Sequence, residues 1–232
     1  MEVFGSITLY NADCVEIMKT MPDNAFELAI VDPPYGINAP KMSMGRIGDR
    51  DSTAHRLRKG RLNSGAGKLK NRALNTLSCE WDSKKPDQEY FDELFRVSKN
   101  QIIWGGNYFS LPPTRGIVCW DKCQPWENFS QVELAWTSFD CPAKIVRISN
   151  TGGANRERKI HPTQKPIALY EWLLSRFAKE GDRILDTHGG SMSSMIACYR
   201  GGYEATCIEL DEGYYKAARA RLELETKQMK LF

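Results

Sequence analysis

The feature that most constrains the fold lies near the carboxyl end, where residues 183–209 read as a strand, a tight turn, a helix and a second strand. The segment RILD at 183–186 is apolar enough for a buried strand, and glycines follow it. A helix is expected over 193–200, and EATCIEL at 204–210 reads as the second strand. A helix that crosses over between two strands predicts that the strands run parallel, which places the chain in the α/β class.

The remaining sequence alternates between strand-like and helix-like periods in the same way. This alternation predicts one Rossmann-like α/β domain over residues 1–232, with a mostly parallel twisted sheet and helices on both faces. One helix is expected with Thr163 or a neighbour as its cap, Pro166 in its first turn and Gly181 at its end. Further strands are expected at 6–10, 26–32, 101–106, 115–120 and 132–139, and further helices at 13–21, 88–97 and 212–227.

One long segment, residues 38–77, interrupts this pattern. It contains ten Lys or Arg residues against two Asp, with little apolar periodicity and frequent Gly and Ser. The net charge of the whole chain is only +3, so the positive charge is concentrated here rather than spread evenly. A loop of this length inside a compact domain is usually functional or disordered, and we expect a mobile, basic insertion.

The composition argues against several classes of protein. No apolar run approaches the length of a membrane helix, and the N-terminus lacks a signal-peptide pattern. The seven cysteines show no CxxC spacing and the three histidines no ligand spacing, so no metal site is expected. Scattered reduced thiols are typical of cytosolic proteins, and a cytoplasmic location is the expectation.

The turn after the 183–186 strand has features of a cofactor site. Asp186 ends the strand, Gly189 and Gly190 allow close approach to the backbone, and the next helix start offers free N–H groups. Glu209 ends the following strand about 20 residues later, where doubly wound folds place an acid that binds ribose hydroxyls. A complete GxGxxG pattern is absent, so a tight turn beside a surface acid is the alternative interpretation.

A second motif, Asp-Pro-Pro-Tyr, begins at Asp32, where the apolar strand ends. Two prolines hold the backbone extended and rigid at that point, and they leave the carbonyl oxygens as acceptors. The Asp32 carboxylate, the Pro33 carbonyl and the flat face of Tyr35 suit the planar exocyclic amine of a nucleobase. The carboxylate would also help to disperse the proton lost when that amine is alkylated. A stiff strand exit with an aromatic cap is the structural alternative.

Together, DPPY at 32–35, HPTQKP at 161–166 and CIELD at 207–211 resemble the beta class of DNA amino-methyltransferases. The resemblance covers most of the chain and implies S-adenosylmethionine as cofactor and double-stranded DNA as substrate. It also implies a single methyltransferase domain with circularly permuted motif order, because the catalytic motif precedes the cofactor motif. DPPY is the usual adenine-N6 form, whereas Ser in the first position is commoner in cytosine-N4 enzymes.

The resemblance implies roles for individual residues. Asp32 and Pro33 would bond the target amino group, and Tyr35 would stack on the flipped-out base. Asp13 is expected near the adenine amine of the cofactor, with capping of the 13–21 helix as the alternative. Lys165 is expected to face the methionine carboxylate, with a solvated helix-start residue as the alternative. The expected cofactor residues are Asp13, Thr163, Lys165, Asp186, His188, Gly189, Gly190, Ser191 and Glu209.

The cofactor turn departs from the family's commonest sequence, D-P-F-x-G-S-G-T-T. Residues 186–194 read D-T-H-G-G-S-M-S-S, so Thr187 and His188 replace Pro and Phe, and Met192 replaces a glycine. If the backbone needs positive φ at that position, Met192 is strained. His188 is expected either to stack on the cofactor or to be an ordinary half-buried histidine.

An enzyme that acts on a base edge must take the base out of the stack, and contacts to phosphates offset that cost. We expect the 38–77 insertion to supply these contacts, together with Arg156, Arg158 and Lys159. A solvated loop that serves solubility is the alternative. Trp104, Gly105 and Asn107 are candidates for the pocket wall, with a core position for Trp104 as the alternative.

The expected function is therefore methyl transfer to adenine N6 of DNA by direct in-line attack, for host protection or as an orphan enzyme. Cytosine N4 is the first alternative, and a non-catalytic DNA-binding derivative, with Met192 as a sign of decay, is the second. Cytosine-C5 chemistry is disfavoured because no Pro-Cys dipeptide occurs. The resemblance leaves a homodimer open.

Overall fold

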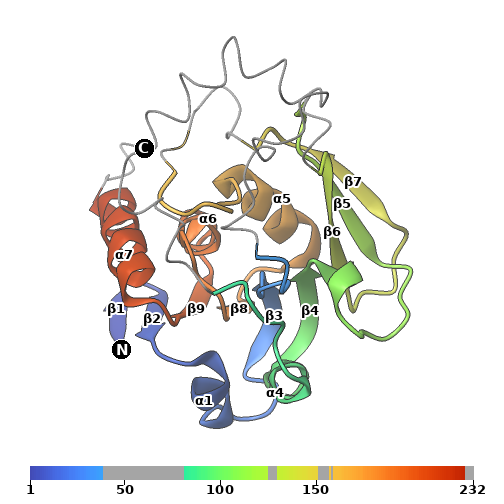
Figure 1. The fold of residues 1–232 in the computed structure, drawn as a ribbon. Coiled ribbons are helices and arrows are strands. Elements are labelled where there is room, and N and C mark those ends of the chain that lie inside the picture. Colours follow the sequence, from blue (N-terminus) through green and yellow to red (C-terminus); the bar gives the residue numbers. More distant parts are fainter. Residues whose placement is uncertain (39–80, 125–129, 151–156, 158, 228–232) are drawn as a thin grey trace.

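The computed structural model describes residues 1–38, 81–124, 130–150, 157 and 159–227. In this part of the chain nine strands form one sheet, in the order β1-β2-β9-β8-β3-β4-β6-β5-β7 (Figure 1). The strands are β1 Glu2–Phe4, β2 Ile7–Asn11, β3 Phe26–Val31, β4 Ser98–Trp104, β5 Ile117–Asp121, β6 Val132–Thr137, β7 Lys144–Arg147, β8 Arg183–Asp186 and β9 Glu204–Glu209. The helices are α1 Cys14–Lys19, α4 Gln88–Val97, α5 Ile167–Phe177, α6 Ser193–Gly201 and α7 Glu212–Lys227, with a short 3₁₀ helix, η4, at Gly106–Tyr108.

The centre of the sheet is parallel, which confirms the expected fold class. β2, β9, β8, β3 and β4 all run in one direction. β1 is antiparallel at one edge, and β6 is antiparallel between β4 and β5. The chain winds outward from β8 to β9 on one side and from β3 to β4 on the other. The boundary between β8 and β3 is therefore the switch point, where open α/β sheets bind ligands.

Helices cover both faces of the sheet. On one face Leu169 of α5 and Met195 of α6 are fully buried in a cluster that also takes in α7. On the other face Leu94 of α4 and Met18 of α1 are fully buried against the opposite side of the central strands. The apolar spacing that predicted these helices reflects this burial. None of the described helices is both long and apolar enough to cross a membrane.

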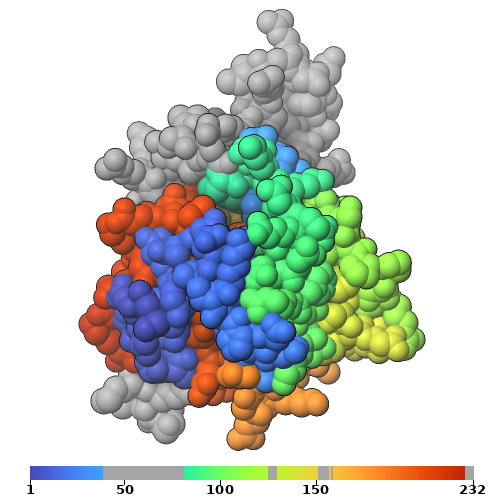
Figure 2. All heavy atoms as spheres, turned by 90° about the horizontal axis from the view of Figure 1, so that it is seen from below, coloured from blue at the N-terminus to red at the C-terminus, as the bar shows by residue number. Residues whose placement is uncertain are grey.

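The two ends of the described chain meet at one edge of the sheet. Figure 2 shows the blue N-terminal strands beside the red C-terminal helix. Glu2 of β1 forms an ion pair with Arg219 of α7 at 2.6 Å and accepts a hydrogen bond from the Tyr215 hydroxyl at 3.1 Å. β2 pairs in parallel with β9 over five residues, so the first and last parts of the fold are one structural unit.

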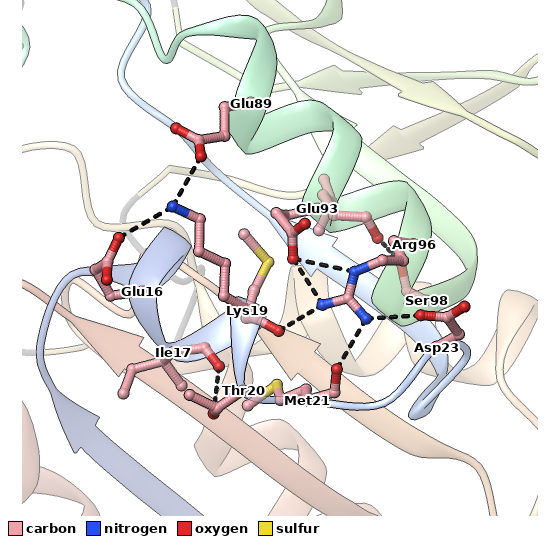
Figure 3. Close-up of polar contacts among 12 residues, drawn as sticks. Glu16, Ile17, Lys19, Thr20, Met21, Asp23, Glu89, Glu93, Arg96 and Ser98 are labelled. Carbon is pink, nitrogen blue, oxygen red and sulfur yellow. Dashed lines mark hydrogen bonds and ion pairs between the residues drawn. The ribbon is translucent and has the colours of Figure 1, made fainter.

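Arg96, near the end of α4, ties that helix to the end of α1 (Figure 3). Its guanidinium donates to the carbonyl oxygens of Met18 and Met21, at 2.7 and 2.8 Å. It also pairs with Asp23 at 2.7 Å and with Glu93 at 2.6 Å. Carbonyl groups at a helix end have no partner within the helix, so a cation placed there satisfies them and opposes the negative end of the dipole. This contact fixes α1 against α4 near the amino ends of β3 and β4, whereas DPPY follows the carboxyl end of β3.

Several element boundaries differ from those expected. The helix predicted to be capped by Thr163 begins at Ile167, with Pro166 as its N-cap, and it ends at Phe177 rather than at Gly181. The strand expected at 101–106 is β4, which begins at Ser98 and ends at Trp104. Trp104 is fully buried, so its core position is confirmed. The strands β1 and β7 are additional to those expected from the sequence, and they form the two edges of the sheet.

Candidate active site

The carboxyl ends of the parallel strands bring the chemical groups of the two motifs to one edge of the sheet. Asp32 directly follows β3, Asp186 ends β8 and Glu209 ends β9. β3 and β8 are hydrogen-bonded neighbours, with Leu28 opposite Ile184. The DPPY motif and the glycine turn, separated by about 150 residues of sequence, therefore flank the switch point.

The Asp32 carboxylate is largely enclosed but not sealed off, since 20% of its side chain is exposed. Its Oδ1 accepts a hydrogen bond from the Tyr35 hydroxyl at 2.7 Å. Its Oδ2 lies 2.6 Å from Nζ of Lys165. Both oxygens are thus already bonded to protein groups, although a carboxylate oxygen can accept more than one hydrogen. An incoming amine would share this carboxylate with Lys165 and Tyr35.

Lys165 has partners that the sequence did not predict. It is not the solvated helix-start residue of the alternative interpretation, since only 3% of its side chain is exposed. Its approach to the methionine carboxylate stays a prediction. Its ammonium lies between Asp32 Oδ2 and Glu133 Oε1, at 2.6 Å from each. The physical reason is charge, because two enclosed carboxylates need a cation and the residue just before α5 supplies it.

Glu133 of β6 completes this cluster. Its Oε2 pairs with Lys122 at 2.8 Å, and its Oε1 also accepts from the Tyr35 hydroxyl at 2.7 Å. Burial alone would raise the pKa of Glu133, but the ammonium groups of Lys165 and Lys122 lower it to about 2. Burial raises the pKa of Asp32; Lys165 opposes this shift and the charge of Glu133 adds to it. The environment therefore separates the two carboxyls into an ionised Glu133 and a more basic Asp32.

Tyr35 lies on Tyr108 of η4 with ring centroids 4.9 Å apart and planes 12° from parallel. One face of the expected base-stacking ring is therefore covered by another aromatic side chain. The ring also requires glycine beside it, because a Cβ on Gly105 would lie 2.2 Å from Tyr35 Cε1. Gly105 has φ +67°, which permits the turn that follows β4. Pro33 is buried, and its carbonyl as an acceptor for the base stays a prediction.

Two carboxylates, those of Asp186 and Glu209, accept backbone N–H groups of the glycine turn. Asp186 is buried; Oδ1 accepts from the backbone N–H of His188 at 3.0 Å and Oδ2 from the Ser194 hydroxyl. Burial raises the pKa of Asp186 to about 7. Glu209 accepts the N–H groups of Gly190 at 2.6 Å and Asp211 at 2.8 Å. Glu209 thus orders the turn, and part of its side chain still faces outward.

Met192 adopts the strained conformation that the sequence comparison predicted. Its φ is +54° and ψ +31°, in the left-handed region, and its side chain is fully buried. Arg221 of α7 supports the turn by donating to the Ser191 carbonyl oxygen at 2.8 Å and to Ser193 Oγ at 2.9 Å. Ser191 itself is buried, with its hydroxyl 3.1 Å from Ser193 Oγ.

His188 is a partly buried residue at the edge of this turn. Its Nδ1 lies 2.9 Å from Thr187 Oγ1, which in turn lies 2.7 Å from the Tyr90 hydroxyl of α4. The Tyr90 and His188 rings meet edge to face at 5.3 Å. Burial lowers the pKa of His188 to about 4, with a small opposing effect from the charge of Asp13. The imidazole is therefore neutral at physiological pH.

Asp13 caps α1, as the alternative interpretation held. Its Oδ1 accepts the N–H groups of Val15 at 2.8 Å and Glu16 at 3.3 Å. Its expected approach to the adenine amine of the cofactor stays a prediction. Thr163 is exposed, with Oγ1 3.2 Å from His161 Nδ1, and it does not cap α5. Glu157 instead accepts the first amide of that helix, from Ile167, at 2.8 Å.

The expected DNA-contacting residues lie mostly outside the described part of the chain. This holds for 39–77 of the basic insertion and for Arg156 and Arg158. Lys159 is described and is partly buried. Burial, together with the charge of Lys122, lowers its pKa. A phosphate contact by Lys159 stays a prediction.

Sequence reasoning missed Glu133, Lys122, Tyr108 and Arg221. A signal for Glu133 was present, since it is the one charged residue within the apolar run VELAWT. Its register matters more: it shares a face with Ala135 and Thr137, which are fully buried, so it points into the core. The sequence offers no comparable signal for Arg221, which lies on a helix with many charged residues.

A parallel sheet with acids and a glycine turn at its switch point defines an α/β protein that binds a nucleoside-containing ligand at the carboxyl edge. The comparisons identify which one. The chain belongs to the DNA methylase family of N6 and N4 enzymes, whose family model matches residues 68–220. Members of this family use S-adenosylmethionine as the methyl donor. The family predicted from DPPY and HPTQKP is thereby confirmed.

Individual relatives agree with this assignment. M.HpaI, a Type II methyltransferase of Haemophilus parainfluenzae, is 34% identical over 84 residues, which are 36% of this chain and 27% of M.HpaI. The cytosine-N4-specific PvuII DNA methyltransferase has a TM-score of 0.57 and 14% identity, covering 97% of this chain and 95% of that one. M1.HpyAVI in complex with SAM has a TM-score of 0.54 and 18% identity, and the match covers 93% of this chain and 98% of M1.HpyAVI. At these identities the two structures show a shared fold.

Proposed function

We propose that this chain transfers a methyl group from S-adenosylmethionine to adenine N6 in double-stranded DNA. The observation that supports it best is the position of Asp32. Its partly exposed carboxylate directly follows β3, at the switch point beside β8. The DPPY form of the motif favours an adenine amine. We further propose that residues 1–232 act as one methyltransferase domain that modifies a short sequence.

The side chains of this protein would hold the exocyclic amine of the target base and accept the proton that it releases. Asp32 and the Pro33 carbonyl would accept its two N–H groups, which directs the nitrogen lone pair away from the ring. Asp32 would then take the proton released by the methylated nitrogen. Because burial and Glu133 raise the pKa of Asp32, it is a better proton acceptor than an exposed aspartate.

S-adenosylmethionine, when bound, supplies a methyl group on a sulfonium and leaves as a neutral thioether. The residues at the glycine turn fit such a ligand. Glu209 would accept hydrogen bonds from ribose hydroxyls, and Asp13 would face the adenine amine. The nine-residue helix α6 has no side-chain cap at its start, so its first amides suit the methionine carboxylate. Gly189, Gly190, Ser191 and His188 would line the path between them.

The test is transfer of a labelled methyl group to mixed-sequence duplex DNA, followed by nucleoside analysis. The wild type is expected to place the label in N6-methyladenine. Asp32→Ala is expected to lose at least about 100-fold in rate, the scale of a general base. Asp140→Ala removes an exposed aspartate, 85% accessible, and is the matched control with unchanged activity. Equal rates for the Asp32 and Asp140 variants would remove the assigned role.

DNA binding is proposed to rest on the basic insertion at 38–77. Its ten cationic residues against two acidic ones support this assignment. Replacing Lys68 and Lys70 by Ala should weaken duplex binding for all sequences and reduce the salt slope by about two ion contacts. If the salt dependence of duplex binding is unchanged, the insertion does not contact phosphates and the alternative, a loop that serves solubility, holds.

Methylation of cytosine N4 is the second candidate, and the fold shared with the cytosine-N4-specific PvuII enzyme favours it. The same acceptor geometry serves both amines, so label in N4-methylcytosine would replace the adenine proposal. A non-catalytic derivative would show no calorimetric affinity for S-adenosylmethionine.

A further inference from the structure

The Tyr35 hydroxyl lies between two carboxylates, and this raises a question of proton count. Its oxygen is 2.7 Å from Asp32 Oδ1 and 2.7 Å from Glu133 Oε1. A phenol carries one proton and donates one hydrogen bond at a time. Burial and the two carboxylates raise the pKa of Tyr35, so the hydroxyl keeps that proton. The second contact is satisfied only if one carboxyl also carries a proton.

The two carboxyls are not equivalent as proton carriers. Among the residues that the structure describes, Glu133 has two lysine partners, Lys165 at 2.6 Å and Lys122 at 2.8 Å, whereas Asp32 has Lys165 alone. Glu133 therefore stays ionised, and Asp32 is the site for an added proton. Once Asp32 is protonated, both contacts of the Tyr35 oxygen are hydrogen bonds: Asp32 donates to this oxygen, and the Tyr35 hydroxyl donates to Glu133.

We propose that Glu133 is a positioning residue that acts through Tyr35: it accepts the Tyr35 hydroxyl when Asp32 takes up the proton released by methylation. The inference rests on the proposed function and assigns a role beyond the DPPY motif. A bond forms from the amine nitrogen to the methyl carbon, and the carbon–sulfur bond breaks with its electron pair on sulfur. The nitrogen then loses one proton to Asp32, while the Tyr35 hydroxyl turns from Asp32 Oδ1 to Glu133 Oε1. No other reactant is needed.

Other charged groups also act on Asp32 and set the background for a test. Lys165 approaches from the segment before α5, and Glu133 from β6. Asp186 at the end of β8 interacts with it electrostatically. The hydroxyl groups of Tyr90 on α4 and Tyr170 on α5 complete the set, and both feel the charge of Asp32. Only Glu133 and Lys165 of these contact the Tyr35 hydroxyl, Lys165 at 3.5 Å.

The decisive variant is Glu133→Gln, which keeps shape but removes charge and weakens the acceptor. A matched control is Glu27→Gln on β3. Glu27 is also partly enclosed between two cations, Lys99 and Arg183, each at 3.1 Å, but it lies near the amino end of β3, whereas Asp32 follows the carboxyl end. Both variants lose the charge of a glutamate that is paired with cations. Only Glu133→Gln also weakens the acceptor for the Tyr35 hydroxyl.

The first measurement needs no activity. With ¹³C-carboxyl aspartate, the Asp32 signal, identified by its absence in Asp32→Asn, is titrated in the DNA-free protein. Glu133→Gln is expected to lower the Asp32 pKa by about one unit or more, because a repelling charge and a strong acceptor are lost. Glu27→Gln should leave it unchanged. An Asp32 titration that is the same in wild type and Glu133→Gln overturns the inference.

The second measurement is the single-turnover methyl-transfer rate against pH. Glu133→Gln should slow transfer about tenfold and move the acid limb to lower pH, which a merely structural role would not do. In a Tyr35→Phe background the same substitution should cost less than about threefold, since coupled residues are not additive. Equal losses in both backgrounds overturn the inference. A wild type that never methylates DNA refutes the proposed function, and the titration then decides the role of Glu133 alone.

Discussion

Nζ of Lys165 lies 2.6 Å from Oδ2 of Asp32, although 133 residues separate the two in sequence. The same ammonium serves Glu133, so one buried lysine holds two carboxylates together. Although burial disfavours its charged form, Asp32 and Glu133 raise the pKa of Lys165. The cation is therefore as much a structural requirement of the site as a chemical one.

Lys165→Met should destabilise the protein by about 3–5 kcal/mol at pH 8, because enclosed Asp32 loses its lysine partner while Glu133 keeps Lys122. The loss should be smaller near pH 5. In the variant, repulsion between Asp32 and Glu133 raises the pKa of one of them in the folded state above its value of about 4 in the unfolded chain. The loss of stability therefore grows as the pH rises above about 4. Urea unfolding at both pH values measures this. Lys216→Met, an exposed i,i+4 pair, should change little. A loss independent of pH would contradict the argument.

Asp186→Asn should gain stability relative to the wild type as pH rises. Burial raises the native pKa of Asp186 to about 7, whereas the unfolded value is about 4. Between these values the unfolded chain releases a proton that the native state retains, so wild-type stability falls across that window. Asparagine cannot ionise, and it sacrifices one hydrogen bond at every pH. The difference between the two proteins should therefore shift by a few kcal/mol from pH 4 to pH 7, in favour of the variant. A constant difference would refute the raised pKa.

Met192→Gly should destabilise the protein even though it relieves strain. A left-handed residue with a Cβ costs about 1–2 kcal/mol, but removing a fully buried methionine side chain costs about 2–5 kcal/mol. The cost of the cavity exceeds the relief of strain, so the free energy of unfolding, measured by chemical denaturation, should fall by about 1–3 kcal/mol. Met192→Ala keeps most of the strain and makes a similar cavity, so it should be less stable than the glycine variant. The reverse order would show that the turn does not need positive φ.

Arg96→Ala should lower the melting temperature by several degrees, because the Met18 and Met21 carbonyls and the Asp23 and Glu93 carboxylates lose their contacts with the guanidinium. Arg96→Lys should recover only part of the loss, since one ammonium cannot reach both carbonyls and both carboxylates in a fixed plane. Arg115→Ala removes an exposed arginine with one ion pair and serves as the control. Equal melting temperatures for all three variants would mean that the α1–α4 contact is not limiting.

The sequence could predict the elements whose periods are long and whose ends are marked. α4 lies at its expected residues because Tyr90, Phe91 and Leu94 repeat at helical spacing and are buried. The helix α6 begins at Ser193 as expected, after the glycine turn. The strain at Met192 was also predictable, because the requirement belongs to one backbone position rather than to a tertiary contact.

The partners of Asp32 could not be predicted from the sequence. DPPY fixes the strand end, but it does not say which distant side chains meet there. Lys165 and Glu133 reach Asp32 only because β6 is inserted antiparallel beside β4 and α5 packs across the same face. Local patterns carry no information on that register, so the contacts of Lys165 with Asp32 and Glu133 were not predictable. Its expected approach to the methionine carboxylate stays a prediction.

The sheet order has a consequence for how the chain matures during translation. β2 is synthesised long before its parallel partner β9, since Asn11 and Glu209 are 198 residues apart. Until then only the short antiparallel pair with β1 is available, and a two-stranded hairpin is marginal alone. A ribosome-bound chain thus lacks the parallel partner of Ile7 and Leu9 until residues 204–209 have been made. The glycine turn likewise gains its carboxylate acceptor, Glu209, only when β9 is in place.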